Sequence, residues 1–441
     1  MESDRARSAN IKYIKMRLFS AGFAITLMLM ITSTLALTQN NFSPSSCSNT
    51  QTPSFSRLMS IASHLAQPDH KTAYKTKHLN SSTSGTNITT NDNNIPISTM
   101  AAAVKADVLI FGAGPAGLAT AGALARQLFT TIVFSDHTSP NGGGFRNART
   151  RHMHNVPGWD HQDPAVFRAK SRADILARYS TIEFRDVGVR SVRQIAGGDG
   201  VDGGVGGVGG DKMRFEAVDV DGVVYRSRRL VVASGIRDVM PEEEIPGYTK
   251  LWGRTIYHCL FCHGYEERGH ASAAVLATDM LANPAHGAGV ARMASRLAGS
   301  VNVYTNGNEA LGDELRAALR DKSRFNVIND KIARVDKDLD VEGNAGLLVT
   351  MADGRVNKEG FMAHMPPAEL NGPFAADLGL KLHPAGYIDV ASPVPLTSVP
   401  GVYAAGDCAT MMRAVPTAIF MGACAAAGIA HELTAEDDVE Q

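Results

Sequence analysis

The chain is poor in cysteine and has no excess of charge of either sign. Five cysteines in 441 residues, an odd number, are too few for a small secreted fold held together by disulfides. The 43 basic and 44 acidic residues nearly cancel, and no basic stripe stands out, so nothing indicates a nucleic-acid partner. The length suits two or three domains of about 150 residues. A composition of 44% hydrophobic residues with 42 glycines is typical of a globular, mixed α/β protein.

Only two of the cysteines have the spacing of a redox pair. Cys259 and Cys262 are separated by two residues, so they can close a small disulfide and carry two electrons. A zinc site that also uses His263 is the alternative, but zinc takes four ligands and no second pair at zinc spacing is present. We therefore predict no metal. Cys408 and Cys424 lie in apolar, Ala/Gly-rich sequence and are expected to be buried.

The N-terminus has the pattern of a targeting or anchoring segment. Basic residues precede an apolar run at residues 18–37, which is typical of a secretory signal or of a membrane anchor. The alternative is a non-native extension of the reading frame, with Met100 as the natural start. Residues 1–37 are thus predicted to be a signal or tether, and residues 38–104 a disordered Ser/Thr/Asn-rich linker. The protein would be secreted or tethered to a membrane if this segment is functional, and cytoplasmic otherwise.

A glycine loop follows the first apolar run after the linker. Asp107–Phe111 is predicted to be a buried parallel strand, residues 112–117 form the glycine loop, and Leu118–Leu128 has helical spacing. Thr131–Phe134 is a second strand that ends near Asp136. Together they form a βαβ unit of about 30 residues.

The glycines of this loop suit a dinucleotide. Gly112 permits a tight turn, Gly114 lets the backbone approach a pyrophosphate, and Gly117 lets the helix pack closely on the strand. The helix N-terminus offers N–H groups to the phosphates, and Asp136 is placed to bind a ribose hydroxyl. The predicted cofactor contacts of this unit are Gly112, Gly114, Pro115, Ala116, Gly117 and Asp136.

Two further strands end in glycine turns. Leu230–Val232 runs into Ala233-Ser234-Gly235, and Gly401–Ala405 runs into Gly406-Asp407 before an Ala-rich helix that continues through Ala430. Asp407 can accept a hydrogen bond from a ribityl hydroxyl, or it can simply cap the helix. The run Gly197–Gly210 is interpreted as a flexible loop on a β-hairpin, with a phosphate-binding loop as the alternative.

A second α/β unit interrupts the first. It comprises a strand at Ala273–Ala277, a helix at Val290–Leu297 and a strand at Val301–Tyr304. We therefore predict a first domain in two halves, an inserted domain and a short tail, with the boundaries 105–243, 244–367, 368–432 and 433–441.

Five motifs give the chain a family resemblance. Over roughly residues 105–432 it resembles the thioredoxin-reductase-like flavoprotein disulfide oxidoreductases. The matching motifs are Gly112-x-Gly114-x-x-Gly117, Asn155-Val156-Pro157-Gly158, Ala233-Ser234-Gly235 with Asp238, Cys259-x-x-Cys262 and Ala404-Ala405-Gly406-Asp407. The resemblance implies two Rossmann-like, three-layer ββα nucleotide-binding domains, the second inserted into the first, and a homodimer. It also implies FAD, with contacts predicted at Asn155, Ala233, Gly235, Gly406, Asp407, Ala414 and Val415.

The departures from this family concern the second nucleotide. The inserted domain should carry its own glycine fingerprint for NADPH, but Thr278–Gly289 contains none. The next strand ends in Thr305-Asn306-Gly307, where the reductases carry arginines for a 2′-phosphate. NADP(H) use is therefore doubtful.

In these departures, and in the stretches 146–160 and 259–266, the chain resembles the gliotoxin-type dithiol oxidases, a branch of the same family. That branch passes two electrons from a small-molecule dithiol to O₂, giving a disulfide and H₂O₂. An NAD(P)H-dependent disulfide reductase is the alternative. A non-catalytic flavin-binding or membrane-tethered protein is a third, which the intact cysteine pair argues against.

The resemblance also implies roles for individual residues. A substrate thiolate would attack Cys259, and Cys262 would face the flavin. His263 follows the second cysteine, where the reductases carry an acid/base Asp, and is the predicted base, with His258 as its competitor. Trp159 and Phe145 either line the substrate pocket or pack in the core.

Overall fold

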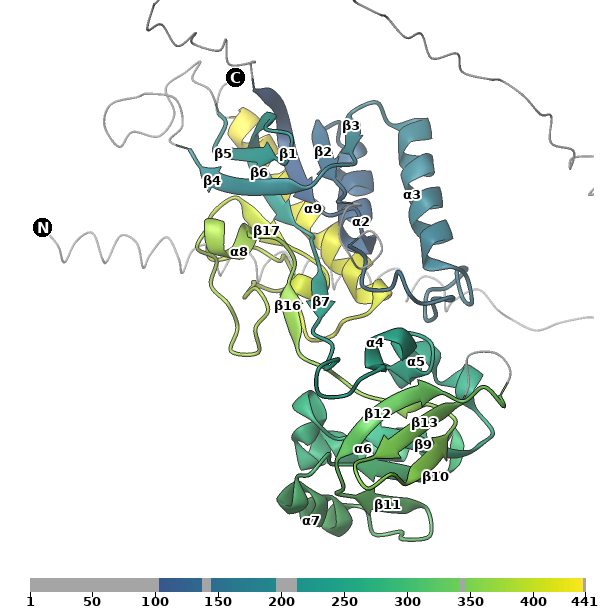
Figure 1. Cartoon of the computed structure of the whole chain (residues 1–441). Helices are drawn as coiled ribbons and strands as arrows, with labels where there is room; N and C mark the ends of the chain where they lie inside the picture. The colour runs from purple at the N-terminus through teal and green to yellow at the C-terminus, as the bar shows by residue number, and fades with distance from the viewer. Residues whose placement is uncertain (1–102, 137–143, 196–211, 342–345, 439–441) are drawn as a thin grey trace, which may run out of the picture. The chain divides into compact units, whose positions relative to one another are not determined.

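The computed structural model describes residues 103–136, 144–195, 212–341 and 346–438 (Figure 1). The predicted signal or anchor, nearly all of the linker, and the glycine-rich run Gly197–Gly210 lie outside the described residues. We call residues 103–238 and 368–438 the first lobe, and residues 239–367 the inserted lobe.

A mostly parallel sheet forms the centre of the first lobe. Its order is β3-β2-β1-β6-β5-β4, and β17 also pairs with β6. The strands predicted at 107–111, 131–134 and 230–232 are confirmed. The strands are β1 (Val104–Phe111), β2 (Thr131–Phe134), β3 (Ile182–Arg185), β4 (Val189–Gln194), β5 (Phe215–Asp219), β6 (Val224–Val232) and β17 (Val402–Ala404).

Strand β1 is buried on both faces, which explains its continuous apolar sequence. Val108 and Ile110 belong to the cluster that contains α2 (Pro115–Ala125) and α9 (Val415–Asp438). Leu109 and Phe111 belong to the opposite cluster, with side chains of β4, β5 and α8 (Phe374–Asp377). The glycine loop that follows β1 is therefore held at the edge of a sheet that is packed on both faces.

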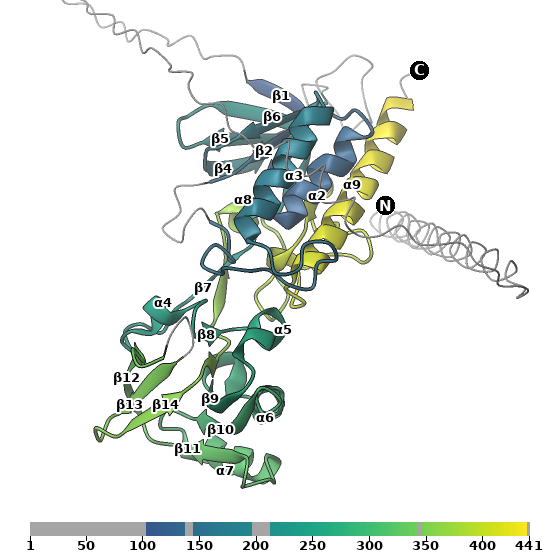
Figure 2. The same ribbon diagram turned by 90° about the vertical axis from the view of Figure 1, so that its right-hand side faces the viewer.

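Helix α2 differs slightly from its prediction. It begins at Pro115 rather than Leu118, because proline is preorganised for the first helical position, and it ends at Ala125 rather than Leu128. Leu128 adopts a left-handed φ of 63° after the helix. Helix α9 lies beside α2 in both ribbon views (Figure 2). A Cβ at Gly422 would collide with the carbonyl oxygen of Ala116, so this glycine permits the close approach.

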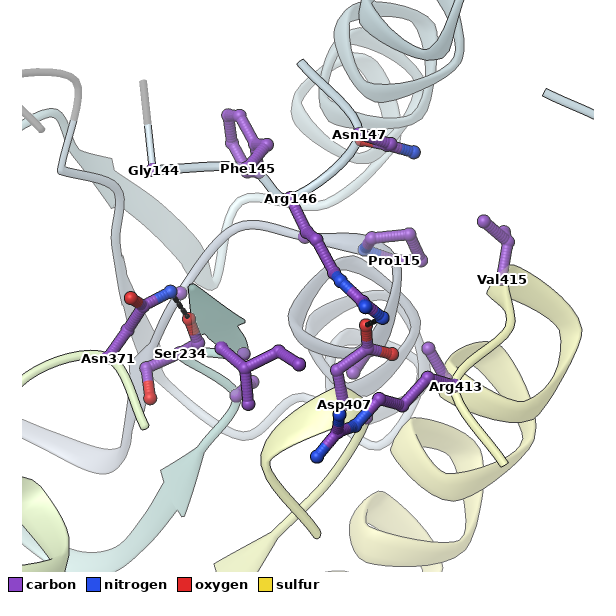
Figure 3. A pocket seen from close by; sticks show the side chains of 18 of the residues that line it. Pro115, Gly144, Phe145, Arg146, Asn147, Ser234, Asn371, Asp407, Arg413 and Val415 are labelled. Atoms are coloured by element: carbon purple, nitrogen blue, oxygen red, sulfur yellow. Dashed lines mark hydrogen bonds and ion pairs between the residues drawn. The ribbon is translucent and has the colours of Figure 1, made fainter. Parts of the chain in front are cut away.

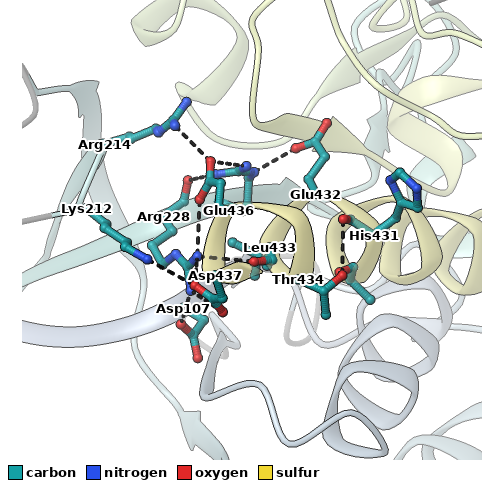
Figure 4. Close-up of polar contacts among 12 residues, drawn as sticks. Asp107, Lys212, Arg214, Arg228, His431, Glu432, Leu433, Thr434, Glu436 and Asp437 are labelled. Atoms are coloured by element: carbon teal, nitrogen blue, oxygen red, sulfur yellow. Dashed lines mark hydrogen bonds and ion pairs between the residues drawn. The ribbon is translucent and has the colours of Figure 1, made fainter. Parts of the chain in front are cut away.

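The prediction for α9 was wrong at both ends. Asp407–Ala409 is a 3₁₀ turn, and the helix begins only at Val415 and continues to Asp438, through most of the predicted tail. Acidic residues disfavour a helix C-terminus. Here ion pairs offset that cost, because Glu436 Oε1 lies 2.6 Å from Arg229 and Asp437 Oδ1 lies 2.7 Å from Arg228 (Figure 4).

Helix α9 also bears on the membrane question. Among the described residues it is the one helix long and apolar enough to cross a membrane by length and composition. Its residues Ala425, Ile429 and Leu433 are buried in the core of the first lobe, and a core helix passes the same test.

The inserted lobe repeats the three-layer plan. A parallel sheet of order β11-β10-β9-β15-β8 carries helices on one face and the antiparallel sheet β12-β13-β14 on the other. The predicted ββα fold is thereby confirmed. The elements are β8 (Ile256–Tyr257), β9 (His270–Leu276), α6 (Pro284–Ala294), β10 (Ala298–Tyr304), α7 (Glu309–Ala318), β11 (Phe325–Ile328), β12 (Ile332–Lys337), β13 (Leu347–Met351), β14 (Val356–Glu359) and β15 (Met362–Ala363).

The helix predicted at Val290–Leu297 lies six residues earlier at its start. Asn283 caps α6 and Pro284 occupies its first turn, so the helix begins at Pro284 and ends at Ala294. Two short antiparallel strands, β7 (Ile236–Asp238) and β16 (Ala368–Leu370), carry the chain out of the first lobe and back. The remaining helices are α3 (Pro164–Arg178), α4 (Tyr248–Leu251) and α5 (Leu260–His263).

Candidate active site

One cavity of about 370 Å³ contains nearly all of the residues predicted to be functional. Gly117 is the exception, because it packs beneath the loop. The predicted residues that line the cavity are Gly112, Gly114, Pro115, Ala116, Asp136, Asn155, Ala233, Gly235, His258, Cys259, Cys262, His263, Gly406, Asp407, Ala414 and Val415. The cavity therefore joins the glycine loop to the cysteine pair.

The three glycines of the loop differ in what a side chain at each position would meet. Gly112 has a φ of 118°, and a Cβ there would collide with the carbonyl oxygen of Ala233. A Cβ at Gly117 would collide with the carbonyl oxygen of Gly112. At Gly114, by contrast, a Cβ would meet nothing within 4 Å. Two glycines thus make the loop compact, and the third leaves open space over the N-terminus of α2.

This open space suits an anionic cofactor. Helix α2 has Gly114 as its N-cap, without a side-chain cap and without an acidic residue in the first turn. Its N-terminal dipole therefore faces the cavity uncompensated. Ser234 Oγ and Arg413 Nε are buried in the cavity lining without a hydrogen-bond partner. These unsatisfied donors, with Asp136 at the end of β2, fit FAD as the bound group.

Arg146 forms an ion-pair cluster that sequence reasoning missed. Its guanidinium donates to both carboxylate oxygens of Asp238, at 2.9 and 2.7 Å. It also lies 3.3 Å from Asp407 Oδ2, a contact that Figure 3 shows. Burial acts to lower the pKa of Arg146, but the two carboxylates together raise it above its ordinary value. Asp407, predicted as a ribityl contact, is therefore already engaged through one oxygen. Arg413 lies beside it (Figure 3), and burial lowers its pKa.

Cys259 and Cys262 form a disulfide at the start of the short helix α5. Cys259 Sγ accepts a hydrogen bond of 3.2 Å from the backbone N–H of Cys262. Asn155, at a left-handed φ of 64°, donates from Nδ2 to the carbonyl oxygen of Phe261 at 3.0 Å. The predicted flavin motif of the first lobe thus touches the helix that carries the redox pair.

The two candidate bases have different electrostatic surroundings. The pKa of His263 is lowered to about 4, mainly by burial and further by the neighbouring His154, while Glu266 opposes the shift. Burial also moves the pKa of His258 well below its ordinary value, and the positive charges of Arg146 and Arg413 add to that shift. A carboxylate faces only His263, so this residue is the better proton acceptor.

The two aromatic residues predicted either to line the pocket or to pack in the core, Trp159 and Phe145, have different surroundings. Trp159 packs edge-to-face on Phe167, with 5.3 Å between ring centroids, in a small core cluster with Val156. Phe145 lines the cavity, and the guanidinium of Arg168 lies 4.0 Å from its ring centroid. Core packing therefore accounts for Trp159, while Phe145 is available to a ligand.

The corresponding strand–helix turn of the inserted lobe is occupied by protein groups. Asn283 Oδ1 accepts from the N–H groups of Ala285 and His286 at 3.0 and 3.2 Å, which caps α6. Asp279 lies in the 3₁₀ turn between β9 and α6, with its Oδ2 3.2 Å from His364 Nε2. At the end of β10, Asn306 Oδ1 accepts from the N–H of Ile332 at 2.9 Å.

Comparisons with known proteins agree with this arrangement. Residues 106–422 match the family model for pyridine nucleotide-disulphide oxidoreductases. Thioredoxin reductase aclD of Aspergillus oryzae is 37% identical, covering 75% of this chain and 97% of its own length. Thioredoxin reductase tcpT of Claviceps purpurea is 39% identical, covering 75% and 95%.

A solved structure is similar as well. The crystal structure of HlmI is 28% identical, with a TM-score of 0.63, covering 76% of this chain and 94% of that one. The family implies a flavin and a pyridine nucleotide, and the cavity residues fit the flavin. The chain belongs to the pyridine nucleotide-disulphide oxidoreductase family and is an FAD-dependent disulfide oxidoreductase.

Proposed function

We propose that this protein oxidises a small-molecule dithiol to a disulfide and passes the two electrons to O₂, giving H₂O₂. One observation carries the proposal: the Cys259–Cys262 disulfide and the open glycine loop line the same cavity. A dithiol that enters this cavity reaches the redox pair directly. FAD bound at the loop would supply the two-electron acceptor for the reduced pair and would itself be reoxidised by O₂.

The thiol–disulfide steps can be assigned to the two sulfurs. A substrate thiolate attacks Cys259, which breaks the Cys259–Cys262 bond and releases the Cys262 thiolate. The second substrate thiol then attacks the mixed disulfide, which forms the product disulfide and releases Cys259. The hydrogen bond from Asn155 to Phe261 holds α5 against the cavity during these steps.

His263 would accept the substrate proton. Transfer from a thiol of pKa about 8.5 to a ring of pKa about 4 is uphill by about 6 kcal/mol in the oxidised state. Cys262 directly precedes His263, so release of its thiolate adds a negative charge that favours the imidazolium and makes the proton transfer less unfavourable. Glu266 acts in the same direction.

A disulfide reductase that uses NAD(P)H is the second candidate, because the relatives aclD and tcpT are both named thioredoxin reductases. The inserted lobe argues against it. Asn283 already caps the helix that would receive the pyrophosphate. The end of β10 carries Thr305, Asn306 and Gly307, and none of these can form the bidentate contact that an arginine makes with a phosphate. The homodimer and the membrane tether at residues 18–37 remain predictions.

The test is turnover with a vicinal dithiol as the only reductant. We expect O₂ uptake with an equal yield of H₂O₂, and loss of both in the variants Cys259→Ser and Cys262→Ser with the bound flavin retained. Cys424→Ser is the matched control, since Cys424 is a free cysteine on α9 that does not line the cavity. Unchanged turnover in either active-site variant would refute the proposal.

A further inference from the structure

We infer that His154, His161 and Glu266 bind one divalent transition-metal ion, most naturally Zn²⁺, at the edge of the cavity. Each residue offers one ligand atom, and the three atoms all lie within 4.8 Å of one another. Imidazole and carboxylate are ligands that suit zinc. The inference is independent of the proposed oxidase activity.

The backbone brings the two histidines together. The N–H of Met153 donates to the carbonyl oxygen of Gln162 at 2.7 Å, and the N–H of His161 donates to that of Met153 at 2.9 Å. These two bonds close the loop, so the rings of His154 and His161 have centroids 5.3 Å apart. His152 stacks on His161 with 3.8 Å between centroids and restrains that ring.

The distances are close to those of an occupied site. Glu266 Oε1 lies 3.4 Å from His154 Nε2 and 3.7 Å from His161 Nδ1. Ligand atoms about 2.0–2.1 Å from a tetrahedral zinc ion lie about 3.3 Å from each other. The largest separation allowed here, 4.8 Å, therefore requires a movement of about 1.5 Å at one exposed side chain. Three protein ligands leave the fourth position open to water or to a thiolate.

The contact of His154 Nδ1 with Asp160 favours a metal ion at the other ring nitrogen, Nε2. Asp160 Oδ1 lies 3.3 Å from His154 Nδ1 and also accepts from the N–H of Asn155 at 3.2 Å. A carboxylate in this place holds the proton on Nδ1 and leaves a lone pair on Nε2, as in zinc sites supported by an outer carboxylate. That nitrogen is buried without a hydrogen-bond partner and lies 3.4 Å from the carboxylate oxygen Oε1 of Glu266. Two acceptors at 3.4 Å repel each other unless a cation, or a second proton on the ring, lies between them.

The ligands come from both lobes. His154 and His161 belong to the first lobe, whereas Glu266 lies in the 3₁₀ turn Tyr265–Glu267, directly after the helix that carries Cys262. A bound ion would therefore fasten the segment of the redox pair to the first lobe.

The direct test is the affinity of the oxidised, flavin-loaded full chain for Zn²⁺, measured by competition with a chromophoric chelator. Keeping Cys259 and Cys262 as a disulfide prevents their thiols from competing. We expect Glu266→Gln and His161→Ala each to weaken the tightest site at least about tenfold. His286→Ala is the matched control, since His286 is exposed on α6 and lies outside the cluster; its affinity should equal that of the wild type.

A second measurement guards against misfolded variants. Zn²⁺ should raise the melting temperature of the wild type and of His286→Ala, but not that of Glu266→Gln, because only an intact site binds the folded state preferentially. Equal Zn²⁺ affinity in the wild type and Glu266→Gln would overturn the inference. So would a zinc-induced melting shift that survives in both Glu266→Gln and His161→Ala.

Discussion

The two strand–turn–helix units of this protein have the same fold, but the N-termini of their helices differ in whether a side chain caps them. In the first lobe, the turn from β1 to α2 leaves the helix N-terminus without a side-chain cap, and a Cβ at Gly114 would meet only open space. In the inserted lobe, the turn from β9 to α6 contains an extra 3₁₀ turn, and Asn283 caps the helix. A helix N-terminus attracts a phosphate only while its N–H groups are available. The first turn therefore offers free N–H groups to a phosphate, whereas those of the second are satisfied by the protein itself.

The largest effect is expected when a side chain is placed in the first of these turns. Gly114→Val should fold, because its φ of -75° is an ordinary one and nothing crowds the new Cβ. The valine would occupy the approach of the pyrophosphate, so FAD affinity should fall about a hundredfold. The flavin-to-protein absorbance ratio after desalting measures this loss.

The control change in the inserted lobe is Gly289→Val, within α6, where a Cβ likewise meets nothing within 4 Å. Its flavin content should equal that of the wild type. Equal flavin content in Gly114→Val and Gly289→Val would show that the first turn does not hold the cofactor.

The next largest effect is on the pH dependence of stability, and it comes from His263, a histidine of the cavity. The pKa of His263 is about 4 in the folded state, against about 6.5 when unfolded. Between these values the unfolded chain binds the proton more tightly, so stability is lost as pH falls from about 6.5 towards 4, by about 2 kcal/mol at pH 5.

His263→Asn should remove this loss, and His286→Asn, a change at an exposed ring on α6, should not. Urea unfolding at pH 7 and pH 5, with a chelator present, measures the difference. Parallel pH profiles of the wild type and His263→Asn would contradict the assigned burial of this ring.

The smallest effect concerns the cap of α6. Asn283→Ala removes the acceptor for two backbone N–H groups and should cost about 1 kcal/mol of stability, with flavin content unchanged. Thermal unfolding of the inserted lobe reports this change. An unaltered melting temperature would mean that the cap contributes nothing and that the helix N-terminus is free for another ligand.

The sequence predicts the parts of the site whose backbone has local requirements. Gly112 and Gly117 could be predicted because only glycine permits their close contacts. Cys259 and Cys262 could be predicted because their spacing permits a small disulfide. The ion pairs of Arg146 are different: its partners lie 92 and 261 residues away, so only the fold brings them together. The cluster of His154, His161 and Glu266 likewise depends on the closure of a loop, which no local sequence pattern predicts.

Helix ends were predicted less well for a related reason. The motif Gly406-Asp407 is typical of a strand followed by a helix cap, but here Gly406 precedes a 3₁₀ turn, Asp407 is the first residue of that turn, and no side chain caps it. The C-terminal extension of α9 depends on ion pairs with Arg228 and Arg229, which belong to a distant strand.

The central claim is that electrons enter through the dithiol cavity and not through the inserted lobe. Anaerobic mixing of the flavin-loaded protein with a vicinal dithiol, and separately with NADPH, tests it most directly by the loss of flavin absorbance. We expect rapid bleaching by the dithiol, dependent on Cys259 and Cys262, and no bleaching by NADPH on the same timescale. Rapid bleaching by NADPH would contradict it.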